Sequence, residues 1–193
     1  MNFNILHEKR KAFMARNKSF DHILIEGKNC VLISAPHGVS QVRLGKPKFC
    51  EIGSIATALA LQEKTDSWFL AKTKNNNDDA NFDEVSSYKN TIQKIIKEQN
   101  IKYLIDIHGL ASKRECDINL GTHLGQNIKA DEKAFNKLFE VLVKNGFKTT
   151  IDQPFMAGAQ TISGSMANKH PELWTIQIEI NCAITNRKEN FDR

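Results

Sequence analysis

The chain has 193 residues, 40% of them hydrophobic, which is enough for one globular domain with a sizeable core. Its formal charge of +5 comes from scattered lysines and arginines, densest at residues 9–16, and forms neither the basic stripe nor the module of a nucleic-acid-binding protein. No apolar run approaches the roughly 18 residues that span a bilayer, and residues 1–16 lack the apolar core of a signal peptide. We therefore expect a soluble, cytoplasmic protein without a nucleic-acid or membrane partner, built as one domain over residues 1–193 with its core at about residues 20–182.

The predicted helices and strands alternate along the chain. Apolar periodicity predicts helices over residues 4–16, 51–63, 88–100 and 134–144. Short β-rich runs predict strands at residues 22–25, 31–34, 68–71, 103–107, 117–120, 147–151 and 173–180. Residues 74–83 are a predicted loop, and residues 152–170 are a long irregular segment of the kind that is often functional. The alternation predicts an α/β fold with a mostly parallel central sheet and helices on both faces.

The four cysteines are spread along the chain. They form no CxxC pair, so neither a zinc finger nor a disulfide framework is indicated, and we expect reduced thiols. They are Cys30, Cys50, Cys116 and Cys182.

The last predicted strand carries polar side chains on one of its faces. In residues 176–181 three isoleucines alternate with Gln177, Glu179 and Asn181, and side chains on a strand alternate between faces. A carboxylate on a buried strand needs a partner, because an unpaired buried charge costs several kcal/mol. A metal ion is one such partner, and the alternative is an ordinary strand on a wet sheet face.

Two histidines stand at the ends of other predicted strands. His37 follows residues 31–34, and His108 directly follows residues 103–107. Reactive groups of open α/β sheets collect at the carboxyl ends of the strands. If these strands and the last one are parallel neighbours, His37, His108 and Glu179 converge. Two imidazoles and one carboxylate are a known ligand set of catalytic zinc, with a fourth position left open.

We take Glu51, at the start of a predicted helix, as the third ligand; the alternative is an acid that only complements the helix dipole. Asp106 precedes His108 by two residues and therefore shares its strand face, where it could orient the imidazole. Alternatively, Asp106 pairs with a nearby arginine or lysine. Of the other histidines, His123 could approach the site, and we expect His170 on the surface.

Six parts of the chain carry a recognisable combination of motifs. They are Ser34-Ala35-Pro36-His37-Gly38, Glu51, Asp106-Ile107-His108-Gly109, Asp117-Ile118-Asn119-Leu120-Gly121, Gln153-Pro154-Phe155 and Ile176-Gln177-Ile178-Glu179-Ile180-Asn181. Together they resemble the N-formylglutamate amidohydrolase family, which is related to the zinc carboxypeptidases and aspartoacylases. The resemblance covers roughly residues 30–182 and implies a phosphorylase/hydrolase-like fold. It also implies one zinc ion held by His37, Glu51 and His108, with Glu179 as the general base.

The chain departs from the family pattern at one position. The family typically has an Asp-x-Asn-Arg sequence whose arginine binds a substrate carboxylate. Here Asn81, which we expect to contact the substrate, is followed by Phe82. Arg43 and Arg114 are then the candidates for binding an anionic group, since arginine pairs with carboxylates through two N–H groups. Surface or structural ion pairs are the alternative role for both arginines.

The sequence thus predicts a metal-dependent amidohydrolase that cleaves a small-molecule amide or acyl amino acid with a metal-activated water. Two alternatives remain: an amidase or peptidase of larger γ-glutamyl or cell-wall peptides, and a non-catalytic metal-binding protein on the same fold. The physiological substrate, the native metal (zinc, cobalt, manganese or iron) and the oligomeric state stay open at this point.

Overall fold

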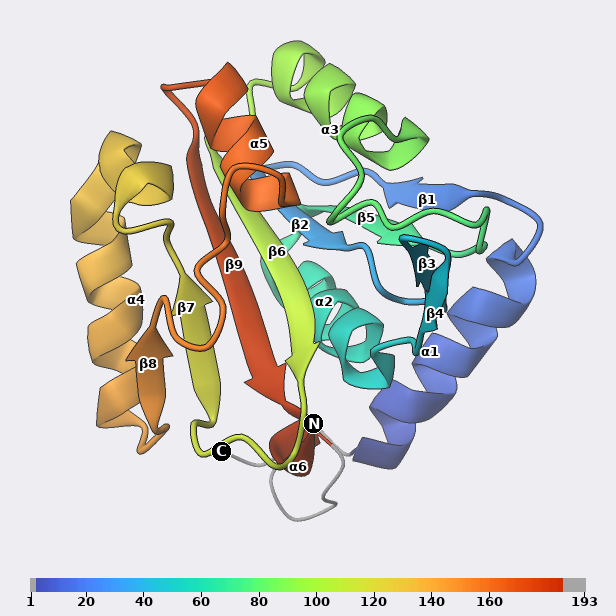
Figure 1. Cartoon of the computed structure of the whole chain (residues 1–193), viewed down its shortest axis with the longest axis horizontal. Coiled ribbons are helices and arrows are strands. Elements are labelled where there is room, and N and C mark those ends of the chain that lie inside the picture. Colours follow the sequence, from blue (N-terminus) through green and yellow to red (C-terminus); the bar gives the residue numbers. More distant parts are fainter. Residues whose placement is uncertain (1–2, 186–193) are drawn as a thin grey trace.

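Figure 1 shows a computed structural model of the chain, which describes residues 3–185 apart from the side chains of residues 3–6 and Ile52. The helical elements are α1 (Phe3–Asn17), α2 (Ile52–Thr65), α3 (Ser87–Glu98), the 3-10 helix η1 (Gln126–Asp131), α4 (Glu132–Lys144), α5 (Ile162–Lys169) and α6 (Cys182–Thr185). The strands are β1 (His22–Ile25), β2 (Val31–Ala35), β3 (Gln41–Arg43), β4 (Lys46–Lys48), β5 (Trp68–Lys72), β6 (Tyr103–Leu110), β7 (Ile118–Gly121), β8 (Thr149–Ile151) and β9 (Trp174–Asn181). None of the helices within residues 3–185 combines the length and apolar character needed to cross a membrane.

The central sheet has seven strands in the order β1-β5-β2-β6-β9-β7-β8. Four of its pairs are parallel, whereas β1 runs antiparallel to β5 and β7 runs antiparallel to β9. The mostly parallel α/β sheet is therefore confirmed. The strands β2, β6 and β9 are adjacent and parallel, as convergence of the predicted site requires.

Helices cover both faces of this sheet (Figure 1). On one face α1, α2 and α4 pack on alternate residues of the central strands, including Ile107 and Ile178. On the other face α3 and α5 pack around Leu104, through buried side chains such as Ile92 and Met166. Because side chains of a strand alternate, Asp106 and His108 share the α3 and α5 face with Leu104. Ile105 and Ile107 of β6 therefore point to the opposite face, toward α2.

Besides the short helices η1 and α6, which were not predicted, three details differ from the sequence prediction. The segment 152–170, predicted to be irregular, contains α5, whose first turn is capped by Thr161 accepting from Gly164 N at 3.1 Å. The strand β6 continues to Leu110, so His108 lies within it and not after it. The two-stranded β3–β4 hairpin was not predicted, because each strand has three residues and one contains a proline.

Candidate active site

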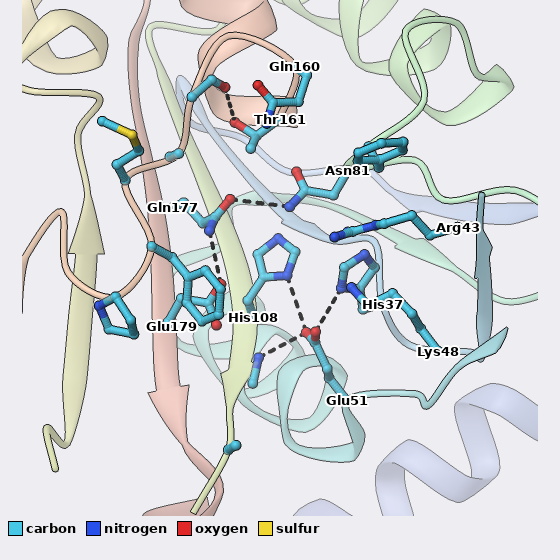
Figure 2. Close-up of a pocket in the computed structure, with 18 of the residues that line it drawn as sticks. His37, Arg43, Lys48, Glu51, Asn81, His108, Gln160, Thr161, Gln177 and Glu179 are labelled. Atoms are coloured by element: carbon cyan, nitrogen blue, oxygen red, sulfur yellow. Dashed lines mark hydrogen bonds and ion pairs between the residues drawn. The ribbon is translucent and has the colours of Figure 1, made fainter. Parts of the chain in front are cut away.

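Three potential metal ligands converge at the carboxyl ends of β2 and β6. His37 Nδ1 lies 2.7 Å from Glu51 Oε1, and His108 Nδ1 lies 3.2 Å from Glu51 Oε2. One ligand atom from each residue can be chosen such that all lie within 4.8 Å of one another. The two imidazoles meet edge to face, with ring centroids 4.6 Å apart. Figure 2 shows both rings directed at the Glu51 carboxylate, as predicted from their positions along the chain.

The backbone fixes where Glu51 stands. It is the N-cap residue of α2, and its backbone N–H donates to the carbonyl of His37 at 2.8 Å. Its side chain does not cap the helix but accepts from the backbone N–H of Gly109 at 2.9 Å. A Cβ at Gly109 would lie 3.1 Å from Glu51 Cβ, so a larger residue here would have to displace the Glu51 side chain slightly.

The far nitrogen of each imidazole contacts a second carboxylate. His108 Nε2 lies 3.0 Å from Asp106 Oδ2, which is the contact expected from their shared strand face. His37 Nε2 lies 2.9 Å from Asp79 Oδ1. Sequence reasoning gave no role to Asp79, although it begins the Asp-x-Asn segment of the family pattern. Both carboxylates are fully buried, and such partners fix the tautomer of a metal-binding histidine.

The buried charges perturb the ionisation of the three converging residues. Burial acts to lower the pKa of His37, but the charge of Glu51 and hydrogen bonds to Asp79 and Glu51 outweigh it and raise that pKa. The pKa of His108 is raised well above its usual value, because Asp106 and Glu51 overcome the opposing effect of burial. Burial acts to raise the pKa of Glu51, yet the two imidazoles hold it far below its ordinary range.

This arrangement suits a divalent cation. A neutral imidazole carries one N–H, so donation through Nε2 to Asp79 or Asp106 leaves the Nδ1 lone pair of each ring facing Glu51. Two lone pairs and a carboxylate then meet at one point, which is favourable only when protons or a cation lie between them. The donor set of two nitrogens and one carboxylate matches a catalytic zinc site. The residues present therefore fit a metal ion.

Glu179 projects from β9 beside this cluster. Its Cα is paired in register with that of His108, and its Oε1 accepts from Gln177 Nε2 at 2.9 Å. Burial, together with the charges of Glu51 and Asp106, raises the pKa of Glu179 to about 7 despite the opposing effect of the histidines. Gln177 was placed on the same strand face by the sequence alternation, but its contact with Glu179 was not predicted.

The hairpin β3–β4 brings Arg43 and Lys48 to one side of the cluster. Arg43 Nε and Nη2 both lie 2.8 Å from Asp79 Oδ2, and its guanidinium carbon lies 4.8 Å from the centre of the Phe82 ring. Lys48 Nζ lies 3.7 Å from the same carboxylate oxygen. Arg43 therefore occupies the neighbourhood of position 82, where the family pattern has its arginine.

The second arginine candidate, Arg114, lines the same cavity but lies beside the loop after β8. The guanidinium carbon of Arg114 lies 5.9 Å from the centre of the Phe155 ring. Phe155 belongs to the loop that follows β8, and β8 lies beyond β7 in the sheet. Of the two candidates, Arg43 and not Arg114 stands next to Phe82.

Both the oxygen and the nitrogen of the Asn81 side-chain amide are hydrogen-bonded within the protein. Its Oδ1 accepts from the backbone N–H of Ile162 at 2.8 Å, and its Nδ2 donates to Gln177 Oε1 at 3.2 Å. Asn81 lines the cavity, and these contacts connect α5 to β9; its contact with a substrate stays a prediction. His123 is not among the described residues that line the cavity. The surface position expected for His170 is wrong, because the residue is 8% exposed.

These groups line one cavity of about 440 Å³. Figure 2 shows Arg43, His37 and Lys48 on one side of Glu51 and His108, with Gln177 and Glu179 on the other. The cavity wall is formed by His37, Arg43, Lys48, Glu51, Asn81, Phe82, His108, Gly109, Ala111, Arg114, residues 154–158, Gln160, Thr161, Gln177 and Glu179. Fold and site together define an α/β domain with a candidate metal centre and a neighbouring carboxylate that can exchange protons.

A profile of N-formylglutamate amidohydrolases matches residues 86–185. Because this segment is just over half of the chain, the protein belongs to the N-formylglutamate amidohydrolase family. The matched segment contains Asp106, His108 and Glu179, whereas His37 and Glu51 precede it. The family supports a hydrolytic enzyme of the amidohydrolase type. A comparison with curated proteins gave no match.

Solved structures share the fold at low sequence identity. The gene product Atu2144 from Agrobacterium tumefaciens aligns with a TM-score of 0.67 and 12% identity, over 94% of this chain and 91% of its own. A bacteriophage poly-gamma-glutamate hydrolase aligns with a TM-score of 0.54 and 11% identity, over 86% and 72%. A metallo-carboxypeptidase from Burkholderia cenocepacia aligns with a TM-score of 0.53 and 13% identity, over 90% and 60%.

Proposed function

We propose that the protein is a zinc-dependent amidohydrolase that cleaves the amide bond of a small molecule or acyl amino acid. The metal is held by His37, Glu51 and His108, and Glu179 is the general base. The observation that carries this proposal is the convergence of the three ligand groups, with the far nitrogen of each imidazole held by a buried carboxylate. Membership of an amidohydrolase family supports the reaction type.

The metal and the protein have separate tasks in this reaction. When bound, zinc lowers the pKa of a coordinated water from ~15.7 to roughly 7 and polarises the substrate carbonyl. Asp79 and Asp106 keep the Nε2–H tautomers of the histidines, so that both Nδ1 atoms remain available as ligands. Glu51 is held by the backbone N–H of Gly109 and stays ionised.

Glu179 moves the proton. It takes a proton from the attacking water as the new carbon–oxygen bond forms, and it returns that proton to the amine nitrogen as the carbon–nitrogen bond breaks. The products are a carboxylic acid and an amine, so no further reactant is needed. Gln177 holds one oxygen of Glu179 and leaves the other for this exchange. The raised pKa of Glu179 suits a group that must both accept and release a proton near neutral pH.

The test separates metal binding from turnover. The purified protein should bind one zinc ion per chain, measured by elemental analysis. The substitution Glu179→Gln should keep the metal and lower turnover of formyl- and acetyl-amino acids by about 10²- to 10⁴-fold, the usual contribution of a general base. Unchanged turnover in this variant would remove Glu179 from its assigned role, and loss of metal in it would place Glu179 among the ligands.

A further inference from the structure

The cavity has a cationic wall on one side of the proposed metal centre. Arg43 and Lys48 both lie near Asp79, so two positive charges face one carboxylate. Asp79 engages Nε and Nη2 of Arg43, and neither contact uses the Nη1 group. The arginine side chain is 32% exposed and lines the cavity. This wall therefore has a net positive charge that favours a ligand carboxylate, and a guanidinium can bind such a carboxylate through two N–H groups.

The opposite wall is mostly apolar. It is formed by Pro154, Phe155, Met156 and Ala157 from the loop after β8, and a charged side chain, Arg114, lies beside it, with its guanidinium carbon 5.9 Å from the centre of the Phe155 ring. The loop backbone is firmly attached, because Phe155 N donates to Asn119 Oδ1 at 3.2 Å and Met156 O accepts from His123 N at 2.6 Å.

The side chains of this loop are nevertheless not buried in the core. Phe155 is 42% exposed and Met156 is 40% exposed, although both belong to an anchored segment that lines the cavity. An apolar ligand that covers this surface removes it from water, which stabilises the complex.

The strand register sets the order of these walls across the sheet. His108 on β6 is paired with Glu179 on β9, and Glu179 is paired in turn with Asn119 on β7. Phe155 is attached to Asn119, on the side of Glu179 away from His108. Arg43 is attached through Asp79 to His37, which follows β2 on the other side of β6. The proposed reacting centre therefore lies between the cationic and the apolar wall.

We propose that the substrate amide carries a carboxylate on one side of the scissile bond and an apolar group, larger than formyl, on the other. The inference rests on the hydrolase function proposed above. The carboxylate binds Arg43 and Lys48, and the apolar group covers Phe155 and Met156. A formyl group ends at its carbonyl carbon and would leave the apolar wall without a contact. Arg43 and Phe155 are thus the specificity-determining residues.

Four amides test the two walls. N-benzoylglycine has both features, N-formylglycine lacks the apolar group, and N-benzoylglycinamide lacks the carboxylate. The monobenzylamide of succinic acid has both features with the amide direction reversed. The kcat/KM of the zinc-loaded protein should be about 10- to 100-fold higher for one of the two complete amides than for either amide that lacks a feature. The complete amide with the higher kcat/KM shows in which direction the amide lies between the two walls.

Two variants assign the preference to the residues. Phe155→Ala should remove the advantage of the benzoyl over the formyl compound, and Arg43→Gln should remove that of the carboxylate over the carboxamide. The matched controls Phe20→Ala and Arg16→Gln change the same residue types outside the cavity wall and should leave both preferences intact. Preference for N-formylglutamate, lost on Arg114→Gln, would overturn the inference while the hydrolase function stands.

Binding measurements separate the proposed substrate site from the proposed hydrolase function if the protein cleaves none of the amides. The zinc-loaded Glu179→Gln variant should bind the preferred complete amide in calorimetry, with affinity reduced by adding either Phe155→Ala or Arg43→Gln. If both substitutions reduce the affinity and the wild-type protein cleaves none of the amides, the hydrolase function is refuted. The proposed site between the cationic and the apolar wall, called the two-walled site, then stands. Binding that is insensitive to both substitutions, or no binding, refutes the two-walled site.

Discussion

The contact between Asp106 and His108 gives a sharp prediction about metal affinity. Asp106 is fully buried, one of its oxygens lies 3.0 Å from His108 Nε2, and its Oδ1 has no hydrogen-bond partner within residues 3–185. Asp106→Asn keeps the shape of the side chain and removes its charge. The imidazole then loses its preference for the Nε2–H tautomer, and a proton on Nδ1 blocks the nitrogen that would bind the metal.

The expected loss is 10- to 100-fold in zinc affinity, the usual effect of removing such a partner, which corresponds to about 1.4 to 2.7 kcal/mol. The assay is competition for zinc against a chelating dye. Asp117→Asn is the matched control, because Asp117 accepts a backbone N–H from Lys148 and contacts no imidazole in the described structure. Urea unfolding of both metal-free variants checks that each is folded. A zinc affinity of Asp106→Asn within about twofold of wild type would refute the reasoning, since it lies below the smallest effect expected.

Three further predictions concern neighbouring parts of the structure. Gly109→Ala places a Cβ 3.1 Å from Glu51 Cβ and should weaken zinc binding about tenfold by displacing that side chain; unchanged affinity would show that Glu51 can move without loss. The buried Lys72 Nζ lies 2.9 Å from Asp21 and 2.8 Å from Asp78, so Lys72→Met should lower the free energy of unfolding in urea by about 3 kcal/mol, and an unchanged value would contradict this. Burial acts to raise the pKa of Asp21, but hydrogen bonds from Ser87, Lys72 and His22 lower it from 3.8 to about 2, so its stabilisation is present above pH 3.8 and lost as the pH falls through about 2. Because the carboxylate is partly exposed, we expect Asp21→Asn to reduce the stability difference between roughly pH 5 and pH 2 by about 1 kcal/mol, and an equal difference in both proteins would be evidence against this role.

The strand-borne half of the site could be predicted because strands alternate and parallel strands end at one edge. Those two rules place Glu179 and Gln177 on one face and bring His37 and His108 to the same edge of the sheet. The neighbours of each strand were an assumption in that reasoning. The sequence contains no local signal that puts β9 beside β6, since the two strands are far apart in the chain.

The loop-borne half could not be predicted from local patterns. Arg43 reaches the cavity through a hairpin of two three-residue strands, and its position depends on contacts with Asp79 and Phe82. The helix α5 has glycine and serine in its first turn, so helix propensity alone does not predict it. Its first turn is stabilised by the Thr161 cap and by the amide of Asn81, which is distant in sequence.

The candidate site combines residues on the sheet with residues on the hairpin and loops, and these parts come from different segments of the chain. The segment matched by the family profile carries His108, Glu179 and the loop with Phe155, whereas the β3–β4 hairpin with Arg43 precedes that segment. His108 and Glu179, to which the proposal assigns the chemistry, lie on adjacent paired strands of the seven-stranded sheet. Within residues 3–185 the two hairpin strands pair only with each other, and contacts near Asp79 attach the hairpin to the body. These are the ion pairs of Arg43 and Lys48 with Asp79 and the hydrogen bond from Val42 N–H to the Asp78 carbonyl. Changes in the hairpin can therefore alter the proposed anion-binding wall without changing the sheet, but a change at Arg43 also acts on Asp79 and through it on His37.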